Sequence, residues 1–457
     1  MLFAALASLV LIARAQAAET AIPIASDPHA ALKTYVEAPD DSYAWTVRRS
    51  GSMNGTDYAE LALTSQTWRD TPWRHQLFLI YPSTIAPDCT HAFLFIGGGS
   101  WRESLAEPAA EGEGLPGEAP LFAQLAEAMQ TPVAVLMQVP FQPMYEGKKE
   151  DELIAYTFEQ FLRTREGDWP LLLPMTKAAV KAMDATTEHA AKRDLKIETF
   201  TVSGASKRGW TTWLTGAADE RATHIAPMVI DVLNMQAQMK LHLDSWGEYS
   251  KMIQPYTNRG LQQALESELG DALRQVVDPY AYIDDLTEPK LVILGTNDPY
   301  WPVNAANLYF DALQGPKYLL YVPNAGHGLI DGDASRVFGG VLAFHRAARG
   351  AAKLPEWNWE HAEAGKGSTI ELTWKEKPIA VRVWRAESND RDFRDERWKA
   401  SEVKDVGDAG ATVEIARPAS GYAATFAEVE YPGVSVFPAR FSTTMKVLGS
   451  DPAFSTP

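Results

Sequence analysis

Residues 198–216 restrict the fold of this chain more than any other stretch. A β-branched, apolar strand runs into a glycine-flanked turn and continues directly into a helix, with Ser206 at the tip of the turn. Such a turn lifts one side chain clear of the backbone and points the first amides of the helix at whatever that side chain attacks, as in a nucleophile elbow. A serine in such a turn can also be a simple helix N-cap, and both interpretations stay open at this point.

The turn departs from the usual G-x-S-x-G pattern. Its sequence is Gly204-x-Ser206-x-Arg208-Gly209, so the small residue before the serine is present but an arginine stands two positions after it. A strand, a glycine-containing turn and a helix occur in every α/β protein. The hypothesis of a nucleophile therefore depends on finding the other groups that such chemistry needs.

A serine hydroxyl is a poor nucleophile until a base accepts its proton. The chain has nine histidines, and four of them fall within predicted helices or strands or in a helical insertion. His327 differs because it follows the last apolar strand, in a loop with a glycine on either side. A loop histidine at that place, downstream of an elbow, is the expected general base.

A third group must orient the imidazole and stabilise it when it is protonated. Asp298 directly follows the apolar strand at residues 290–295, and the order serine, aspartate, histidine is that of α/β-hydrolases. Asp231, at the end of the strand after the elbow, is the alternative acid. We prefer Asp298 because its place after the strand is the commoner one for the acid.

The oxyanion that forms during acyl transfer needs backbone donors already in position. The amide of Lys207 follows the nucleophile, and a run of three glycines follows the buried strand at residues 91–96. This run resembles the glycine-rich oxyanion loops of lipases and esterases, so Gly98 or Gly99 is expected to give the second donor. Nucleotide binding is disfavoured because no G-x-x-x-x-G-K-[ST] pattern follows.

Hydrophobic patterning predicts an α/β-hydrolase fold over residues 28–353. Short alternating runs before residue 90 indicate antiparallel strands at the leading edge of a sheet. Nearly continuous apolar strands separated by helices then indicate a parallel sheet covered on both faces. The acidic segment 104–120 is expected to be an exposed loop beside the site. Residues 232–287, long helical sequence after a strand end, are expected to be a lid.

Alternation returns after residue 354. Short strands are predicted at 369–374, 379–384, 411–416, 422–429 and 441–447, separated by turn residues. Several short alternating strands indicate a small β-sandwich domain over residues 354–450. Such a domain could bind sugar or protein, or it could buttress the catalytic domain.

Other side chains near these loops are candidates for substrate contact. Arg208 is either a structural cation paired with a carboxylate, which we favour, or a fork that binds a substrate carboxylate. Aromatic residues gather around the loops in sequence and predict an apolar or sugar-stacking wall, although they could equally be core. They are Trp101, Trp210, Trp246, Tyr300 and Trp301.

Composition limits the partners and the compartment. An excess of acidic over basic residues gives a net charge of −17, which argues against nucleic acid or an anionic membrane as a main partner. Residues 1–18 indicate a bacterial signal peptide and hence a secreted or periplasmic protein, and no other stretch is long and apolar enough to span a bilayer. The single cysteine excludes an intrachain disulfide or a thiolate metal cluster, and the predicted chemistry needs neither a metal nor an organic cofactor.

Four longer strings carry a family resemblance. They are ELIAYTFEQFL at 152–162, WPLLLPMTK at 169–177, VSGASKRGWTTW at 202–213 and GTNDPYW at 295–301. On these strings the chain resembles the PhoPQ-activated pathogenicity-related family of α/β-hydrolase-like exported proteins, and the arginine after the serine belongs to that family's own pattern. The resemblance implies the fold, export and a site formed by Ser206, Asp298 and His327. It leaves the substrate open.

The sequence therefore predicts an exported serine hydrolase. An esterase is our first hypothesis and a peptidase acting on small peptides the second. A sugar-acid esterase of the glucuronoyl type is a third, because a basic residue also follows the serine there. The competing class is a hydrolase-like protein that only binds a partner, and the presence of all three groups and the glycine loop argues against it.

Overall fold

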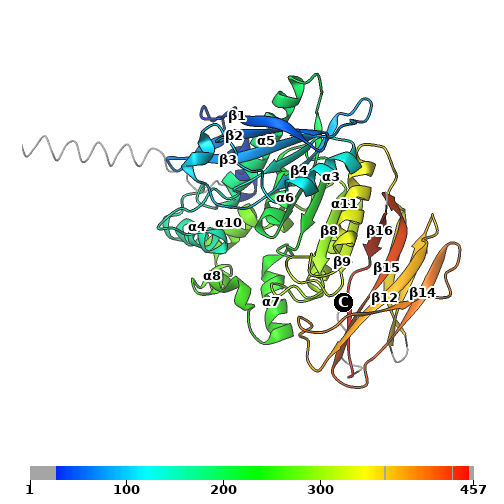
Figure 1. The fold of residues 1–457 in the computed structure, drawn as a ribbon. Coiled ribbons are helices and arrows are strands. Elements are labelled where there is room, and N and C mark those ends of the chain that lie inside the picture. Colours follow the sequence, from blue (N-terminus) through cyan, green and yellow to red (C-terminus); the bar gives the residue numbers. More distant parts are fainter. Residues whose placement is uncertain (1–26, 365–366, 435, 452–457) are drawn as a thin grey trace, which may run out of the picture.

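A mixed β-sheet forms the centre of the larger part of the molecule in the computed structural model (Figure 1). The structure describes residues 27–364, 367–434 and 436–451, so the predicted signal peptide at 1–18 lies outside the described residues. The strands run in the order β1-β2-β3-β5-β4-β6-β7-β8-β9. Their bounds are β1 (Ala44–Met53), β2 (Thr56–Trp68), β3 (Thr71–Tyr81), β4 (His91–Ile96), β5 (Val133–Leu136), β6 (Thr199–Ala205), β7 (His224–Met228), β8 (Lys290–Gly295) and β9 (Lys317–Val322).

The strand order identifies the α/β-hydrolase fold. β1, β2 and β3 pair in antiparallel fashion and β3 is antiparallel to β5, whereas all pairs from β5 to β9 are parallel. β5 lies between β3 and β4, so the chain crosses over once before it continues outward through β6 to β9. The predicted fold class and its antiparallel leading edge are confirmed.

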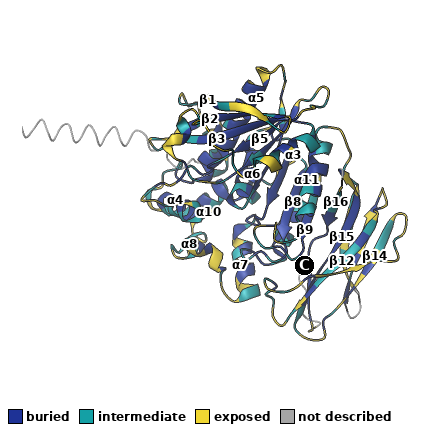
Figure 2. Cartoon of the chain, viewed as in Figure 1, coloured by how far each residue is buried: buried dark blue, intermediate teal, exposed yellow. Residues whose placement is uncertain are grey.

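Helices cover both faces of the sheet, which explains why the central strands are buried on both sides (Figure 2). α4 (Glu150–Thr164), α5 (Leu172–Ala191) and α6 (Lys207–Ala218) share a core with one face, and α3 (Ala119–Met129) and α11 (Ala334–Ala348) share a core with the other. Neighbouring strand residues alternate between the two cores: Leu94 belongs to the first and Phe93 to the second. The strands are therefore held on both sides, and their ends give fixed positions to the loops that follow.

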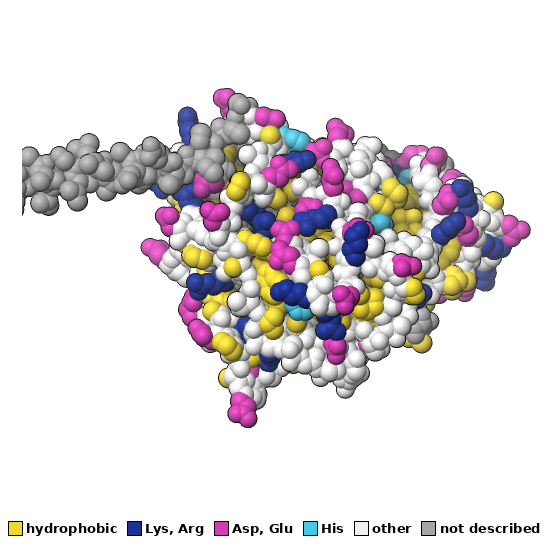
Figure 3. All heavy atoms as spheres, turned by 90° about the horizontal axis from the view of Figure 1, so that it is seen from above, with side chains coloured by type: hydrophobic (Ala, Val, Ile, Leu, Met, Phe, Trp, Pro, Cys, Tyr) yellow, Lys and Arg dark blue, Asp and Glu magenta, His cyan; other side chains and the backbone are white. Residues whose placement is uncertain are grey.

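The segment predicted as a lid is helical. Between β7 and β8 the chain forms α7 (Met235–Trp246), α8 (Gln254–Thr257), α9 (Leu261–Ala264) and α10 (Glu268–Val277). In the part of the chain that the structure describes, no helix is long and apolar enough to cross a membrane. On the face shown in Figure 3, acidic and basic side chains are interspersed, without one block of either sign.

The C-terminal region is a β-sandwich, as predicted. One sheet has the order β10-β11-β14 and the other β13-β12-β15-β16, with β17 also paired to β15. β15 is buried on both faces, because Val429 shares a core with the smaller sheet while Phe426 packs with Tyr321 of β9. The strand bounds are β10 (Trp357–Ala364), β11 (Gly367–Trp374), β12 (Ala380–Ser388), β13 (Lys399–Glu402), β14 (Gly410–Ala416), β15 (Tyr422–Val434), β16 (Phe437–Ser442) and β17 (Lys446–Gly449).

One local prediction was wrong. The strand expected at 441–447 is split into β16 and β17, because the backbone of Met445 is held by the side chain of Asn307 instead of joining the ladder.

The 104–120 segment is mostly exposed, as predicted. Its Glu113 forms ion pairs with Arg48 and Arg49 of β1. Leu115 and Pro116 line a pocket together with Gly97 and Gly98 of the glycine run. That the segment lies beside the catalytic groups stays a prediction.

Candidate active site

The elbow forms because small residues let the backbone approach itself closely. Ser206 has a φ of 59° and a ψ of −128°, in the left-handed half of backbone space, and its amide donates to the carbonyl of Met228. A Cβ on Gly204 would lie 2.7 Å from the Arg208 carbonyl oxygen, and one on Gly209 would lie 2.8 Å from the Met228 carbonyl oxygen. The second glycine is therefore needed one position later than in G-x-S-x-G, which leaves Arg208 free to carry a side chain.

Ser206, His327 and Asp298 form one hydrogen-bonded chain. The Oγ atom of Ser206 lies 2.8 Å from Nε2 of His327, and Nδ1 of His327 lies 2.8 Å from Oδ2 of Asp298. The other Asp298 oxygen accepts from the backbone amide of Tyr300 at 2.9 Å. The Tyr300 ring covers the imidazole, with the ring centroids 4.2 Å apart. A carboxylate fixed in this way can hold the imidazole with Nε2 directed at the serine.

Asp231, the alternative acid, takes no part in that chain. Its Oδ1 accepts from the hydroxyl of Tyr309 at 2.6 Å, and its side chain is buried. Burial, together with a smaller effect of the nearby Asp298 charge, raises the pKa of Asp231 to about 7 against the opposing effect of the Tyr309 hydrogen bond. The geometry therefore favours Asp298 as the group that contacts the histidine.

The raised pKa of Asp231 predicts a pH-dependent effect on stability. The folded state holds a proton on this group up to about pH 7, whereas the unfolded chain loses it near the ordinary value of 3.8. The folded state therefore binds more protons between these values, and Asp231 destabilises the protein as the pH rises. Between pH 5 and pH 8, we expect the free energy of unfolding of Asp231→Asn to increase by roughly 2–3 kcal/mol relative to that of wild type. Urea unfolding of both proteins at pH 5 and pH 8 measures this change. A stability difference between variant and wild type that is the same at both pH values would contradict the prediction.

The glycine run lies where an oxyanion loop is expected. A Cβ on Gly98 would come within 2.6 Å of the Arg208 guanidinium, so a side chain there would displace the arginine. The carbonyl of Gly98 accepts from the Gln138 amide, and the carbonyl of Gly99 accepts from the Gln142 side chain. Among the described residues, the amides of Gly98, Gly99 and Lys207 make no hydrogen bond to protein, so they can act as donors.

Arg208 is held by protein groups. Its two terminal nitrogens each lie 2.7 Å from a carboxylate oxygen of Glu150, and its Nε donates to the carbonyl of Val139 at 2.5 Å. Burial would raise the pKa of Glu150, but hydrogen bonds from Arg208 and Gln142 and the charges of Arg208 and Lys207 lower it to about 2. Glu150 fills the fork of Arg208, which favours the structural alternative over the prediction that Arg208 binds substrate.

Two carboxylates beside the nucleophile were missed by sequence reasoning. Glu150 and Asp151 begin α4, and their oxygens lie 3.1 and 3.3 Å from Nζ of Lys207. Asp151 also accepts from the hydroxyls of Tyr256 and Tyr300. The two acidic residues at the start of a helix gave a signal for helix capping only, so nothing in the sequence placed them near Ser206.

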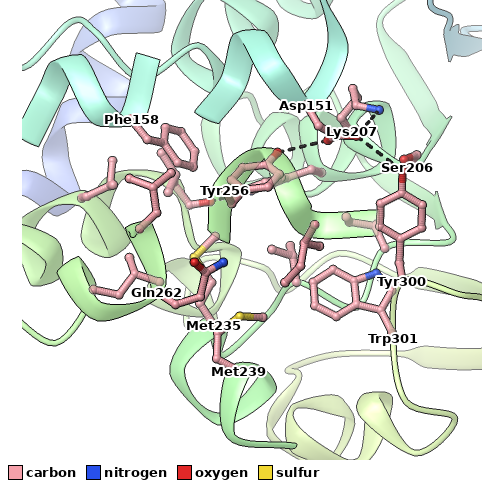
Figure 4. Close-up of a pocket in the computed structure, with 18 of the residues that line it drawn as sticks. Asp151, Phe158, Ser206, Lys207, Met235, Met239, Tyr256, Gln262, Tyr300 and Trp301 are labelled. Atoms are coloured by element: carbon pink, nitrogen blue, oxygen red, sulfur yellow. Dashed lines mark hydrogen bonds and ion pairs between the residues drawn. The ribbon is translucent and has the colours of Figure 1, made fainter. Parts of the chain in front are cut away.

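A cavity of about 90 Å³ opens beside Ser206 and His327 (Figure 4). Residues 230–277 and α6 supply most of its wall, so much of the segment predicted as a lid borders the cavity. That it acts as a lid stays a prediction. Tyr300, Trp301 and Trp210 line this cavity, as predicted for aromatic residues near the site. Trp101 and Trp246 do not. Trp101 packs against Phe141, and the Arg394 guanidinium lies 4.0 Å over the Trp246 ring.

A loop of the sandwich contacts the loops that carry Asp298 and His327. The side-chain nitrogen of Asn297 donates to the carbonyls of Arg394 and Glu396 at 2.9 and 2.8 Å. Asn324 donates to the carbonyl of Trp398 and accepts from its amide, at 3.1 and 2.8 Å. The segment between β12 and β13 therefore joins both loops.

The chemistry of the site rests on hydroxyl, imidazole and carboxylate groups joined by hydrogen bonds. Their arrangement can activate a nucleophile and stabilise an oxyanion. Within the described ranges, no three His, Cys, Asp or Glu side chains are grouped so that they could hold a metal ion.

Comparison with known proteins gives a family and a sequence relative. The PhoPQ-activated pathogenicity-related protein family matches residues 32–394. The autocrine proliferation repressor protein A of Dictyostelium discoideum is 32% identical over 437 residues, which cover 88% of this chain and 85% of that protein. The family match includes the elbow, the acid, the histidine and the lid segment.

Several solved hydrolases are similar in structure at low identity. Acetyl xylan esterase 1 of Thermoanaerobacterium sp. JW/SL YS485 matches with a TM-score of 0.45 and 13% identity, over 67% of this chain and 89% of that one. A glucuronoyl esterase from Solibacter usitatus matches with a TM-score of 0.41 and 14% identity, over 70% of this chain and 92% of that one. A puromycin-hydrolyzing peptidase of Mycobacterium tuberculosis matches with a TM-score of 0.41 and 14% identity, over 69% of this chain and 50% of that one. The strand order, and not these likenesses, identifies the fold.

Proposed function

The chain belongs to the PhoPQ-activated pathogenicity-related protein family, and from the chemistry of its site we propose that it is a serine hydrolase that cleaves an ester bond. The observation that carries the proposal is the continuous hydrogen-bonded chain from Asp298 through His327 to Ser206 at the tip of an elbow. A protein that only bound a partner through this surface would have no need for that alignment.

The reaction follows from the positions of these groups. His327 accepts the hydroxyl proton on Nε2 while Ser206 Oγ bonds to the substrate carbonyl carbon. Asp298 stabilises the resulting imidazolium, and the amides of Lys207 and Gly98 or Gly99 donate to the oxyanion. The leaving alcohol takes the proton from His327 and departs, which leaves an acyl-enzyme. Water then attacks the acyl carbon with His327 again as base, and the acid product leaves Ser206 free.

Charge balance around the nucleophile supports a neutral substrate group. Lys207 and Arg208 are each paired with Glu150 or Asp151. Neither cation is available to bind a free substrate carboxylate. A glucuronate ester has its carboxyl group esterified and carries no such charge, so the glucuronoyl-type hypothesis stays open. Asp151 is equally engaged, which weakens the case for a peptidase that anchors a free amino group. An ester with an uncharged acyl group fits these pairings best.

We also propose that the protein is exported, to the periplasm or beyond, on the basis of the apolar N-terminal sequence ending in small residues. A single cysteine cannot form an intrachain disulfide, and the large packed core of a chain of this length can stabilise an exported protein in its place. The candidate substrate is a small molecule.

Labelling with a fluorophosphonate probe tests the proposed function. Wild type is expected to react covalently at Ser206, as located by mass spectrometry of the labelled peptide. Ser206→Ala and His327→Ala are expected to stay unlabelled, because one lacks the nucleophile and the other lacks its base. Circular dichroism of each variant controls for folding. A folded wild type that does not react, or that reacts at another residue, would overturn the proposal.

A further inference from the structure

The cavity beside Ser206 defines a class of substrate. We propose that it receives the acyl group of the substrate, and that this group is an uncharged, mostly apolar chain with a hydrogen-bond donor, such as a hydroxyl, near its far end. This inference rests on the proposed function of Ser206. Its basis is the lining of the cavity, the pairing of the polar groups in it, and one polar atom that has no partner among the described residues.

The wall of the cavity is apolar and comes from several elements. Side chains of α6, α7, α9, α10 and the segment after β7 surround it, and most of them are buried. An aliphatic chain placed there would leave water for apolar contacts, at about 0.8 kcal/mol for each methylene group. The buried side chains of the apolar wall include Trp210, Val232, Met235, Leu261, Leu273 and Val277.

The charged groups of the cavity are compensated within the protein. Asp151 accepts hydrogen bonds from Tyr256 and Tyr300 and pairs with Lys207. A charged acyl group would lose its hydration without gaining a free counter-charge. The acyl group is therefore expected to be neutral.

Gln262 provides a specific polar contact that remains open. Its side chain lines the cavity from α9 and is 8% exposed, and its Oε1 is buried without a hydrogen-bond donor among the described residues. Figure 4 shows Gln262 on the side of the cavity away from Ser206. A buried acceptor without a partner costs free energy. A substrate that brings a hydroxyl or N–H group to this point would gain a hydrogen bond that a plain alkyl chain cannot form.

The size of the cavity limits the length of the chain. A cavity of about 150 Å³ holds benzene, which is roughly 25 Å³ for each non-hydrogen atom. At the same volume for each atom, a cavity of about 90 Å³ accommodates about three to four non-hydrogen atoms. An acetyl group would leave most of the apolar wall without contacts. An unbranched chain of about four non-hydrogen atoms fills this volume.

The buried surroundings assign the cavity to the acyl side of the ester. After the first step the acyl group stays attached to Ser206, whereas the alcohol must leave before water can attack. A group surrounded by the helices between β7 and β8 is slow to leave the cavity. This suits the acyl group, which remains bound to Ser206, better than the alcohol. The leaving group is then expected on the open side of Ser206, where the half-buried His327 is reached from solvent.

The test uses alkyl fluorophosphonates that differ only in the alkyl arm, namely ethyl, butyl and 3-hydroxypropyl. The last two have equal length and differ by a terminal methyl or hydroxyl group. For wild type we expect second-order labelling rates at Ser206 at least about tenfold higher for butyl than for ethyl, and about tenfold higher again for 3-hydroxypropyl. Equal rates for all three arms would overturn the acyl-site proposal.

Two variants and one control sharpen the test. Gln262→Met keeps the size of the side chain and removes its acceptor, so the butyl arm is expected to react faster than the hydroxylated arm. Met239→Trp is expected to fill the cavity and to remove the advantage of both long arms over ethyl. Gln263→Met, an exposed neighbour on the same helix that does not line the cavity, is the matched control and should keep the wild-type order. An unchanged order in Gln262→Met would refute the role of Gln262.

The outcomes separate this inference from the proposed function. If no arm labels folded wild type, the serine is not activated and the proposed function fails. If all arms label Ser206 at the same rate, the serine is activated but the cavity does not select the chain. Because the readout is labelling, it does not depend on finding an ester that the protein hydrolyses.

Discussion

Asp298→Asn is expected to lower the rate of acyl transfer by about 10⁴-fold, whereas Asp231→Asn should change it by less than about threefold. The carboxamide that replaces the Asp298 carboxylate could keep its position but could not stabilise an imidazolium, and it would favour the wrong tautomer of His327. Asp231 contacts Tyr309 and not the histidine, so its replacement leaves the hydrogen-bonded chain intact.

The measurement is the rate of fluorophosphonate labelling, or kcat on any ester found to be cleaved, for wild type and both variants. The two aspartates make matched controls, since each is buried, each lies just beyond a strand of the same sheet and each change replaces one oxygen by an NH₂ group. Loss of activity in Asp231→Asn with activity kept in Asp298→Asn would reverse the assignment of the acid. Equal loss in both would point to a shared effect on folding, which thermal unfolding measures directly.

The grouping of Ser206, Asp298 and His327 could be predicted because it depends on topology. Each residue follows the C-terminal end of a strand, and the C-terminal ends of parallel strands meet at one edge of the sheet. Continuous apolar runs identified β4 and β8 with their observed bounds for the same reason, since both faces of these strands are covered. The position of a residue along the chain was sufficient to predict its place in the site where the sheet determines that place.

The roles of individual side chains in the site could not be predicted in the same way. Trp101 and Tyr300 both lie in loops at strand ends, yet only Tyr300 faces the cavity, because side-chain direction in a loop depends on local dihedral angles that sequence does not reveal. Glu150 lies 58 residues before Arg208, and only the packing of the start of α4 beside the start of α6 brings the two together. Such pairs depend on tertiary contacts, and no periodic signal marks them.

The role of the sandwich likewise emerged only from contacts between domains. Its sheets were predicted from alternation, but the segment between β12 and β13 gave no sign that it reaches the site. There, Asn297 is adjacent to Asp298, and Asn324 is three residues before His327. Both asparagines bind backbone groups of that segment. The sandwich therefore supports the two loops whose spacing sets the hydrogen bond between His327 and Asp298.

Asn324→Ala is accordingly expected to lower kcat by roughly 10–100-fold, because misplacing a catalytic group by about 1 Å can cost about 10² in rate. KM should change by less than about threefold, since Asn324 does not line the cavity. The change also leaves the amide and carbonyl of the buried Trp398 without their partner, which is expected to reduce the free energy of unfolding by about 1–3 kcal/mol. Steady-state kinetics and urea unfolding of the purified full-length chain measure the two effects.

Asn307→Ala is the matched control for this prediction. Asn307 also joins the hydrolase part to the sandwich through two hydrogen bonds to one backbone, at 2.7 Å to the carbonyl and 3.3 Å from the amide of Met445. It contacts neither the Asp298 loop nor the His327 loop through these bonds, so its loss should reduce stability by a similar amount while kcat stays within about twofold of wild type. If both variants lower kcat equally, the asparagine contacts act only through general stability. If Asn324→Ala alone lowers kcat, the sandwich positions the histidine loop for catalysis.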